Sequence, residues 1–145
     1  TLHTNDTTSS YSRLLDMGVD PFLITSTVRA IIAQRLIRKI CTSCRKERAV
    51  NEFEQEKYGF SSGEKVFESN NDGCQNCAGN GFRGRCGIYE LLIPTHSINE
   101  MINNRVSDQE IRMQAINENM NTLTNEAKRL AINGITSIDE IIRVL

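Results

Sequence analysis

Two short stretches, Cys41-Thr-Ser-Cys44 and Cys74-Gln-Asn-Cys77, decide how the middle of this 145-residue chain folds. A C-x-x-C turn directs two sulfur atoms toward one point, and two facing turns supply the four thiolates that a structural zinc ion prefers. The two pairs are separated by 29 residues and no signal peptide is visible, which favours metal binding over secreted-type disulfides. We therefore predict a structural zinc site with four ligands: Cys41, Cys44, Cys74 and Cys77.

Other interpretations of the cysteines stay open. The two pairs can form two disulfides, hold iron, or act as a redox pair. Residues 74–81 also match a C-x-x-C-x-G-x-G unit of the J-domain chaperones, but a single unit is not a repeat. The fifth cysteine, Cys86, lies nine residues past the second pair in a predicted strand, where we expect a small buried apolar side chain.

Residues 41–81, which the cysteines bracket, are polar and show little periodicity. Such a segment cannot bury enough apolar surface to offset the entropy lost on ordering. We therefore predict that bound zinc supplies the folding free energy of this segment. The basic residues after the first pair are expected to offset the thiolate charge: Arg45, Lys46 and Arg48.

The residues before the first cysteine predict two helices. One runs from Ser9 or Ser10 to Gly18, since serine is a good N-cap and glycine a good C-cap. The second begins at Asp20-Pro21 and ends near Lys39, because its apolar residues recur every four positions. That stripe consists of Val28, Ile32, Leu36 and Ile40.

The residues after the second pair predict a strand over 82–93, ended by Pro94, and then helices. Three Ser-x-x-Glu capping boxes mark helix starts, at residues 97–100, 107–110 and 137–140. Gly134 is expected to end the helix that carries Ala127, Leu130 and Ala131.

Composition limits the function classes. Hydrophobic residues make up 39% and charged residues 24% of the chain, which is typical of a globular protein. A net charge of −1 gives no overall attraction for nucleic acid, and the basic run over residues 29–48 lacks interleaved aromatic residues for base stacking. We interpret that run as a solvated face, although it could meet an anionic lipid surface. The first residue is Thr1, not Met, which suggests an excised fragment.

The chain contains no phosphate-binding loop of the form G-x-x-x-x-G-K-[ST]. The nearest match, Gly79 to Gly84, is followed by Arg85 and Cys86, so it lacks both the lysine and the hydroxyl that holds magnesium. It also precedes a strand where a helix is needed. We predict that this chain alone hydrolyses no nucleotide.

Four stretches together resemble the traffic ATPase family of type II secretion and type IV pilus assembly (GspE/PilB-like). They are TLHTN at 1–5, AQRLIRKIC at 33–41, GFRGRCGIYELL at 81–92 and GITSIDEIIRV at 134–144. With the two cysteine pairs, the resemblance covers nearly all of the chain in order. Cys86 departs from the threonine usual in the third stretch, which is a change of similar volume.

The resemblance implies an α/β fold, namely the C-terminal part of a RecA-like P-loop ATPase core with a zinc-binding insertion and a C-terminal helical bundle. The expected division places the core section at 1–40, the zinc-binding subdomain at 41–81, the returning strand at 82–94 and the helical subdomain at 95–145. The Walker A and Walker B strands would then lie before Thr1.

For function, the resemblance implies a cytoplasmic ATPase, peripheral at the inner membrane, that forms homo-hexamers and binds ATP and magnesium. Its partners would be inner-membrane platform proteins of a secretion or pilus machine, and not nucleic acid. The four-cysteine insertion favours an assembly or secretion member over the retraction branch, which lacks it. The alternative is a zinc-stabilised docking module without enzymatic activity. A nucleic-acid-binding zinc ribbon is disfavoured by the near-zero net charge.

Individual roles follow from the same resemblance. His3 matches the histidine of the family's His box, placed near the γ-phosphate as a catalytic or sensing residue, although an exposed histidine at a frayed terminus is the simpler interpretation. Arg83 and Arg85 are candidates for binding nucleotide, and Arg35 and Arg38 for contacts with nucleotide or a neighbouring subunit. For these arginines, ordinary surface pairs, for example with Glu90, remain an equal alternative.

Overall fold

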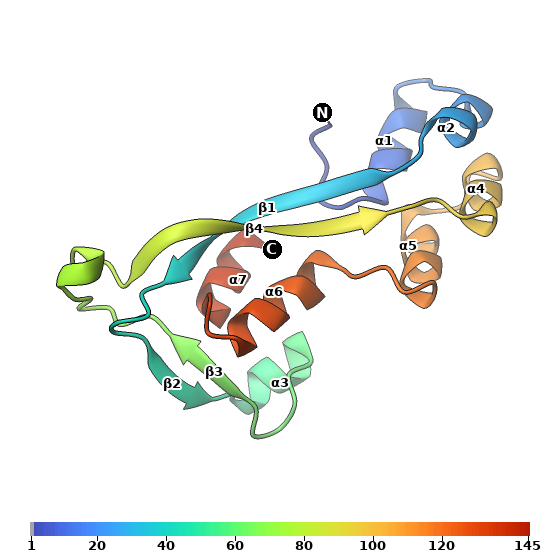
Figure 1. Ribbon diagram of the computed structural model, residues 1–145. Helices are drawn as coiled ribbons and strands as arrows, with labels where there is room; N and C mark the ends of the chain where they lie inside the picture. Colours follow the sequence, from blue (N-terminus) through green and yellow to red (C-terminus); the bar gives the residue numbers. More distant parts are fainter. Residues whose placement is uncertain (1) are drawn as a thin grey trace. The chain divides into compact units, whose positions relative to one another are not determined.

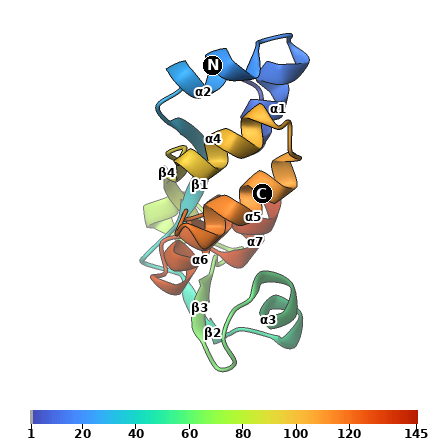
Figure 2. The same ribbon diagram turned by 90° about the vertical axis from the view of Figure 1, so that its right-hand side faces the viewer.

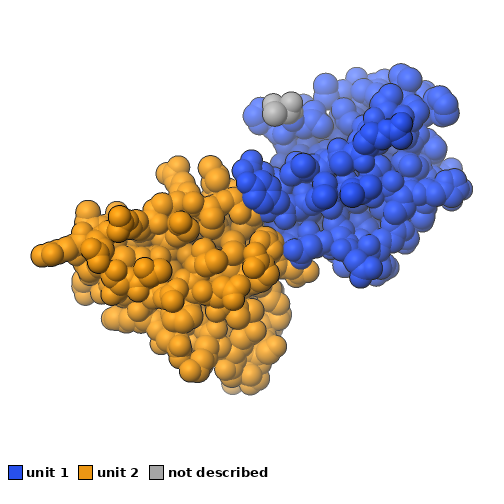
Figure 3. Space-filling model, in the orientation of Figure 1, with its two compact units in different colours: residues 1–34, 89–123 blue, residues 35–88, 124–145 orange. Residues whose placement is uncertain are grey.

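The computed structural model of the protein describes residues 2–145, and these form two compact units of mixed α/β structure (Figures 1 and 3). Of the described residues, the first unit comprises 2–34 and 89–123, and the second comprises 35–88 and 124–145. In chain order the elements are α1 (Ser9–Asp16), α2 (Pro21–Thr27), β1 (Ile31–Ile40), β2 (Lys46–Ala49), α3 (Glu52–Tyr58), β3 (Lys65–Glu68), the 3₁₀ turn η1 (Gln75–Cys77), β4 (Phe82–Leu92), α4 (His96–Asn103), α5 (Asp108–Asn117), α6 (Leu123–Ile132) and α7 (Ile138–Val144).

The first unit is built from four short helices, α1, α2, α4 and α5, which pack against one another (Figure 2). The predicted helix over residues 9–18 is confirmed as α1, and Gly18 follows it with φ +83°. Each helix contributes one or two apolar side chains to a common core, because amphipathic helices this short gain their stability from packing. This core contains Tyr11, Ile24, Leu92, Ile98, Ile102, Ile111, Ala115 and Met120.

The prediction of one long helix from Asp20 to Lys39 is wrong. The helix α2 ends at Thr27, and the strand β1 begins at Ile31. A spacing of four positions is close to one helical turn, but it is also twice the two-residue repeat of a strand, so the apolar stripe fits both structures. The β-branched residues favour the strand. In the last turn of the helix, the hydroxyl of Thr27 donates to the carbonyl of Leu23 at 2.6 Å.

The strand predicted over residues 82–93 is confirmed as β4, which pairs with β1 in a two-stranded sheet. β4 carries Glu90, whose side chain is fully buried in the first unit. Its Oε1 atom accepts hydrogen bonds from Thr7, at 3.0 Å from the amide and 2.6 Å from the hydroxyl. Arg112 donates to both carboxylate oxygens. Glu90 thereby holds the chain that leads from His3 into α1 against the strand.

Residues 41–81 contain more regular structure than we predicted. β2 and β3 pair antiparallel, with Arg48 opposite Val66, and α3 lies between them in the chain. The helix α3 has a complete capping box, since the Asn51 side chain accepts from the Glu54 amide and Glu54 accepts from the Asn51 amide. Gly59 ends it in the left-handed conformation, at φ +67°.

Two of the three serines that we predicted as capping residues do begin helices after β4. Ser107 and Ser137 are confirmed as N-caps of α5 and α7, each accepting a hydrogen bond from the amide three residues later. The prediction for Ser97 is wrong, because Thr95 caps α4 and accepts from the amide of Ile98. Thr95 comes directly after Pro94 and has the extended backbone and the hydroxyl that an N-cap needs, so the helix begins two residues earlier than the serine suggested.

Gly134 ends α6 as predicted, with φ +66° and hydrogen bonds that close the last turn. A Cβ atom at this position would lie 2.5 Å from Nη1 of Arg45 and 2.6 Å from the ring of Phe67. Replacement by alanine therefore adds both backbone strain and a steric clash. We expect Gly134→Ala to lower the free energy of unfolding by about 2–4 kcal/mol, measured by urea denaturation of the zinc-loaded protein.

Gly18→Ala is the matched control for this prediction. Gly18 has φ +83° but no atom within 4 Å of an added Cβ, so only the backbone strain of about 1 kcal/mol remains. Equal losses from the two variants would mean that the space around Gly134 accommodates a methyl group.

Candidate metal centre

The two C-x-x-C stretches fold as tight turns. The first turn follows the end of β1, and the second lies in the loop before β4. Cys41 follows β1, and its amide donates to the carbonyl of Gly81 at 2.8 Å, which ties the two turns together. In the first turn, the amides of Cys44 and Arg45 donate to the Cys41 carbonyl. In the second, η1 carries the chain from Cys74 to Cys77. These hydrogen bonds fix where the four sulfur atoms point.

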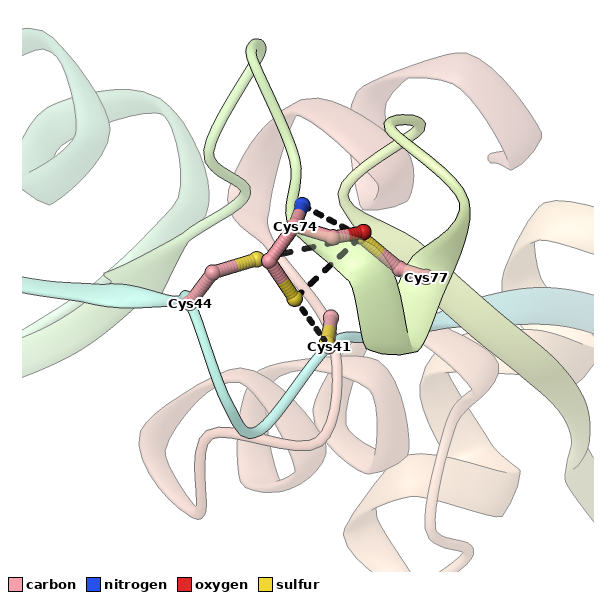
Figure 4. A group of neighbouring side chains, drawn as sticks. All are labelled: Cys41, Cys44, Cys74 and Cys77. Carbon is pink, nitrogen blue, oxygen red and sulfur yellow. Dashed lines mark hydrogen bonds between the residues drawn. The ribbon is translucent and has the colours of Figure 1, made fainter.

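The four sulfur atoms converge on one point (Figure 4), and all lie within 4.8 Å of one another. The Sγ–Sγ distances are 3.8 Å between Cys41 and Cys74 and between Cys74 and Cys77, and 3.9 Å between Cys44 and Cys77. With zinc–sulfur bonds of about 2.3 Å, the edge of a ZnS₄ tetrahedron is about 3.8 Å. The sulfur positions therefore fit a tetrahedral ion of that size.

The disulfide interpretation does not fit this geometry. A disulfide bond is about 2.05 Å long, and all five cysteines are free thiols. Cys86 lies outside the four-sulfur group and is half-buried, and burial raises the pKa of its thiol. The cluster therefore contains the four cysteines of the predicted zinc site.

The surroundings of the cluster oppose its full ionisation in the absence of a cation. Burial acts to raise the pKa of Cys77, but amide hydrogen bonds from Cys74 and Gly81 lower it to about 6. By contrast, burial and the other three sulfurs raise the pKa of Cys44 to about 12. A divalent ion removes this conflict, because it binds thiolates and offsets their mutual repulsion.

Two of the three basic residues after the first pair, Arg45 and Arg48, form their hydrogen bonds and ion pairs with groups other than the sulfur atoms, contrary to our expectation. Arg45 donates to the carbonyl of Gly134 and stacks on Phe67, with its guanidinium carbon 4.3 Å from the ring centre. Arg48 forms ion pairs with Glu54 at 2.5 Å and Glu68 at 3.2 Å. Alongside Arg45, the basic residues that line the depression beside Cys41 are Lys39 and Arg83.

His3, the proposed box histidine, is exposed in the first unit. It lines a depression of about 250 Å³ together with Arg13 and Asp16 of α1. Sequence reasoning did not single out Arg13, because one arginine on a polar helix face carries no spacing signal. The neighbouring Thr1, which begins the His-box match, lies outside the described residues.

Arg83 and Arg85 are both exposed on β4 in the second unit, but they line different depressions. Arg83 lies near Cys41. Arg85 shares a depression with Arg38 and Arg143. Arg38 pairs with the buried carboxylate of Glu140 and not with Glu90, the partner that we had suggested for the arginines.

The second buried carboxylate, Glu140 of α7, was not singled out by sequence reasoning beyond its place in a capping box. It accepts hydrogen bonds from the backbone and guanidinium of Arg38 and from the guanidinium of Arg143. Burial opposes its charge, but these donors lower the pKa of Glu140 to about 2. Arg38 and Glu140 are 102 residues apart in the sequence, so no local pattern reveals that they pair.

Together these features define a mixed α/β protein with a four-cysteine cluster suited to a metal ion. Within residues 2–145, no helix is both long and apolar enough to cross a membrane. The chain belongs to the family described as type II/IV secretion system protein, whose model matches residues 1–143.

Curated relatives match almost all of this chain. It is 33% identical to "Type II secretion system protein E" of Pseudomonas aeruginosa, over 99% of this chain and 28% of that protein. It is 38% identical to "Type IV pilus assembly ATPase PilB" of Myxococcus xanthus, over 98% of this chain and 26% of that protein. "Type II secretion system ATPase E" of Vibrio cholerae is 32% identical, over 99% and 28%. The chain thus spans about a quarter of the length of these relatives.

Proposed function

We propose that this chain is the C-terminal part of a hexameric cytoplasmic ATPase that powers type II protein secretion or type IV pilus assembly. One observation carries the proposal. Nearly the whole chain is similar to a segment that makes up about a quarter of the length of proteins named as ATPases of these two systems. The missing phosphate-binding loop agrees with this, since the nucleotide-binding strands would belong to the remaining three quarters.

In this proposal, residues 1–40 and 82–94 complete a RecA-like core, residues 41–81 bind structural zinc, and residues 95–145 form the helical subdomain. His3 and Arg13 line one depression. This supports a site where both side chains contact the phosphates of an ATP molecule that the rest of the parent protein holds. The parent would bind magnesium with ATP and associate with inner-membrane platform proteins without spanning the membrane.

Zinc is the metal that the cluster fits best. Four thiolates with tetrahedral spacing leave no position for water, so the ion would be structural and not catalytic. Cys41, Cys44, Cys74 and Cys77 would hold it, and it would fix the two turns that connect β1 to β2 and β3 to β4.

The test compares ATP hydrolysis by the 145-residue chain with hydrolysis by the full-length parent. We expect no hydrolysis by the chain, and magnesium-dependent hydrolysis by the parent that rises as it assembles into particles of six-subunit mass. A parent that assembles but does not hydrolyse ATP would overturn the proposal. That result would favour the alternative, a zinc-stabilised docking module without enzymatic activity.

A further inference from the structure

The loop between the second cysteine pair and β4 contains the dipeptide Asn80-Gly81, which is prone to spontaneous loss of the asparagine side-chain amide. The backbone nitrogen of the following residue attacks the side-chain carbonyl carbon, and glycine hinders this attack least because it has no Cβ. The fold requires a glycine here, since Gly81 has φ +70° and an added Cβ would lie 2.5 Å from the carbonyl oxygen of Asn70. The labile pair is therefore built into the loop.

Hydrogen bonds hold this dipeptide in a fixed conformation in the folded protein. The amide of Gly81 donates to Sγ of Cys77 at 3.3 Å, and its carbonyl accepts from the amide of Cys41 at 2.8 Å. The side-chain oxygen of Asn80 accepts from the amide of Phe82 at 2.9 Å. The attacking nitrogen and the attacked side chain are thus both held by other partners, although Asn80 itself is exposed to water.

The two bonds that fix Gly81 both end on residues of the four-cysteine cluster, Cys41 and Cys77. These residues belong to different turns, and a shared ion would keep the turns together. In small domains with structural zinc, metal binding supplies most of the folding free energy. Loss of the metal is therefore expected to open both turns and to release the peptide between Asn80 and Gly81.

We propose that Asn80 is a modification site guarded by the metal centre, and that it converts to aspartate or isoaspartate when zinc is lost. The Gly81 nitrogen forms a bond to Cγ of Asn80 and the Cγ–Nδ2 bond breaks. The side-chain NH₂ group leaves as ammonia, with the proton of the Gly81 amide. Water then opens one of the two C–N bonds of the cyclic imide and gives either product. No group is oxidised or reduced, and water is the only co-reactant.

The isoaspartate product would prevent the turn from closing again. Its main chain passes through the former side chain, which adds one carbon atom between residue 80 and Gly81. The extra bond lengthens the backbone by about 1.5 Å, so Gly81 cannot keep its hydrogen bonds to both Cys41 and Cys77. A chain that stays without zinc should therefore lose the ability to bind it again. This inference rests on the proposed structural zinc and not on the proposed motor function.

The test incubates the full chain at neutral pH and physiological temperature, either zinc-loaded or after treatment with a chelator. Elemental analysis first establishes the zinc content. Peptide mapping by mass spectrometry then measures amide loss at Asn80, and enzymatic methylation of isoaspartyl carboxylates counts the isoaspartate. We expect conversion to be about tenfold faster without zinc, the change in open population that about 1.4 kcal/mol gives. Zinc added promptly should be taken up again, whereas zinc added after conversion should not.

The dipeptide Asn133-Gly134 is the internal control. Asn133 is exposed like Asn80, but the amide of Gly134 donates to the carbonyl of Ala131 at 2.9 Å, in the last turn of α6, and not to a sulfur atom. Its conversion should change little when zinc is removed. Equal acceleration at Asn80 and Asn133 would show general unfolding of the unit and would overturn the guarding role of the metal centre.

Asn80→Gln is the control variant, because its longer side chain would have to close a six-membered ring, which forms much more slowly. After long incubation without zinc it should still bind zinc again, and failure to do so would mean that Asn80 chemistry is not what blocks rebinding. Equal conversion of Asn80 in the zinc-loaded and zinc-free chains overturns this inference alone. A chain that binds no zinc overturns the structural zinc site, and this inference with it.

Discussion

Replacement of Cys77 by serine is expected to abolish zinc binding and to unfold residues 41–81. Binding of structural zinc contributes about 10–16 kcal/mol in small zinc domains, which is as large as the total stability of a typical domain. Cys77 is 4% exposed and its sulfur accepts amide hydrogen bonds from Cys74 and Gly81. A serine oxygen forms neither the zinc–thiolate bond nor the same amide contacts, so both turns lose their anchor.

The measurement is zinc content by elemental analysis, together with hydrogen exchange along the chain. The unaltered protein should contain one zinc per chain and protect the amides of β2 and β3. Cys77→Ser should contain almost none and lose that protection, whereas α1 and α2 of the first unit should stay protected. A chelator should give the same loss in the unaltered protein, and added zinc should reverse it.

Cys86→Ser is the control, because Cys86 lies outside the four-sulfur group. It should keep one zinc and full protection. A Cys77→Ser protein that retains zinc and protection would contradict a structural metal site, as would equal loss of zinc from both variants.

The convergence of the four cysteines was predictable because it depends on short-range geometry. A C-x-x-C turn is local, and the only long-range information needed is that two turns meet. The cap of α3 was equally local, since Asn51, Glu54 and Gly59 stand at the standard start and end positions of a helix. We nevertheless predicted irregular structure there, because the segment lacks an apolar period.

The boundary between α2 and β1 could not be derived from spacing. Val28, Ile32, Leu36 and Ile40 repeat every four positions, which satisfies a helix and a strand alike. Pairing with β4, about 50 residues later in the chain, stabilises the strand. The roles of the buried carboxylates could not be predicted for the same reason. Glu90 accepts a hydrogen bond from Thr7 and Glu140 accepts one from Arg38, and these partners lie far apart in the sequence.

Replacement of Glu140 by glutamine is expected to lower the free energy of unfolding by about 1–3 kcal/mol at neutral pH, because the buried side chain loses its charge-assisted hydrogen bonds. Arg38 and Arg143 are 41% and 56% exposed, so water continues to solvate their charges in the variant. The glutamine amide keeps the shape of the side chain but accepts through one oxygen only. Its NH₂ group would face the donors of Arg38 and Arg143. The control is Glu47→Gln, whose exposed pair with Lys65 contributes about 0.2–1 kcal/mol.

The pH dependence separates charge from packing in this prediction. The pKa of Glu140 is lowered to about 2 from its ordinary value of 4.5, so the unfolded chain binds this proton more readily than the folded one. Its stabilising effect is therefore complete above pH 4.5 and is lost as the pH falls toward 2. Acid also releases metal from both proteins, so the difference in stability between the unaltered protein and Glu140→Gln is the informative quantity. That difference should shrink between pH 4.5 and 2. A difference that stays constant over this range would assign the role of Glu140 to packing and not to its charge.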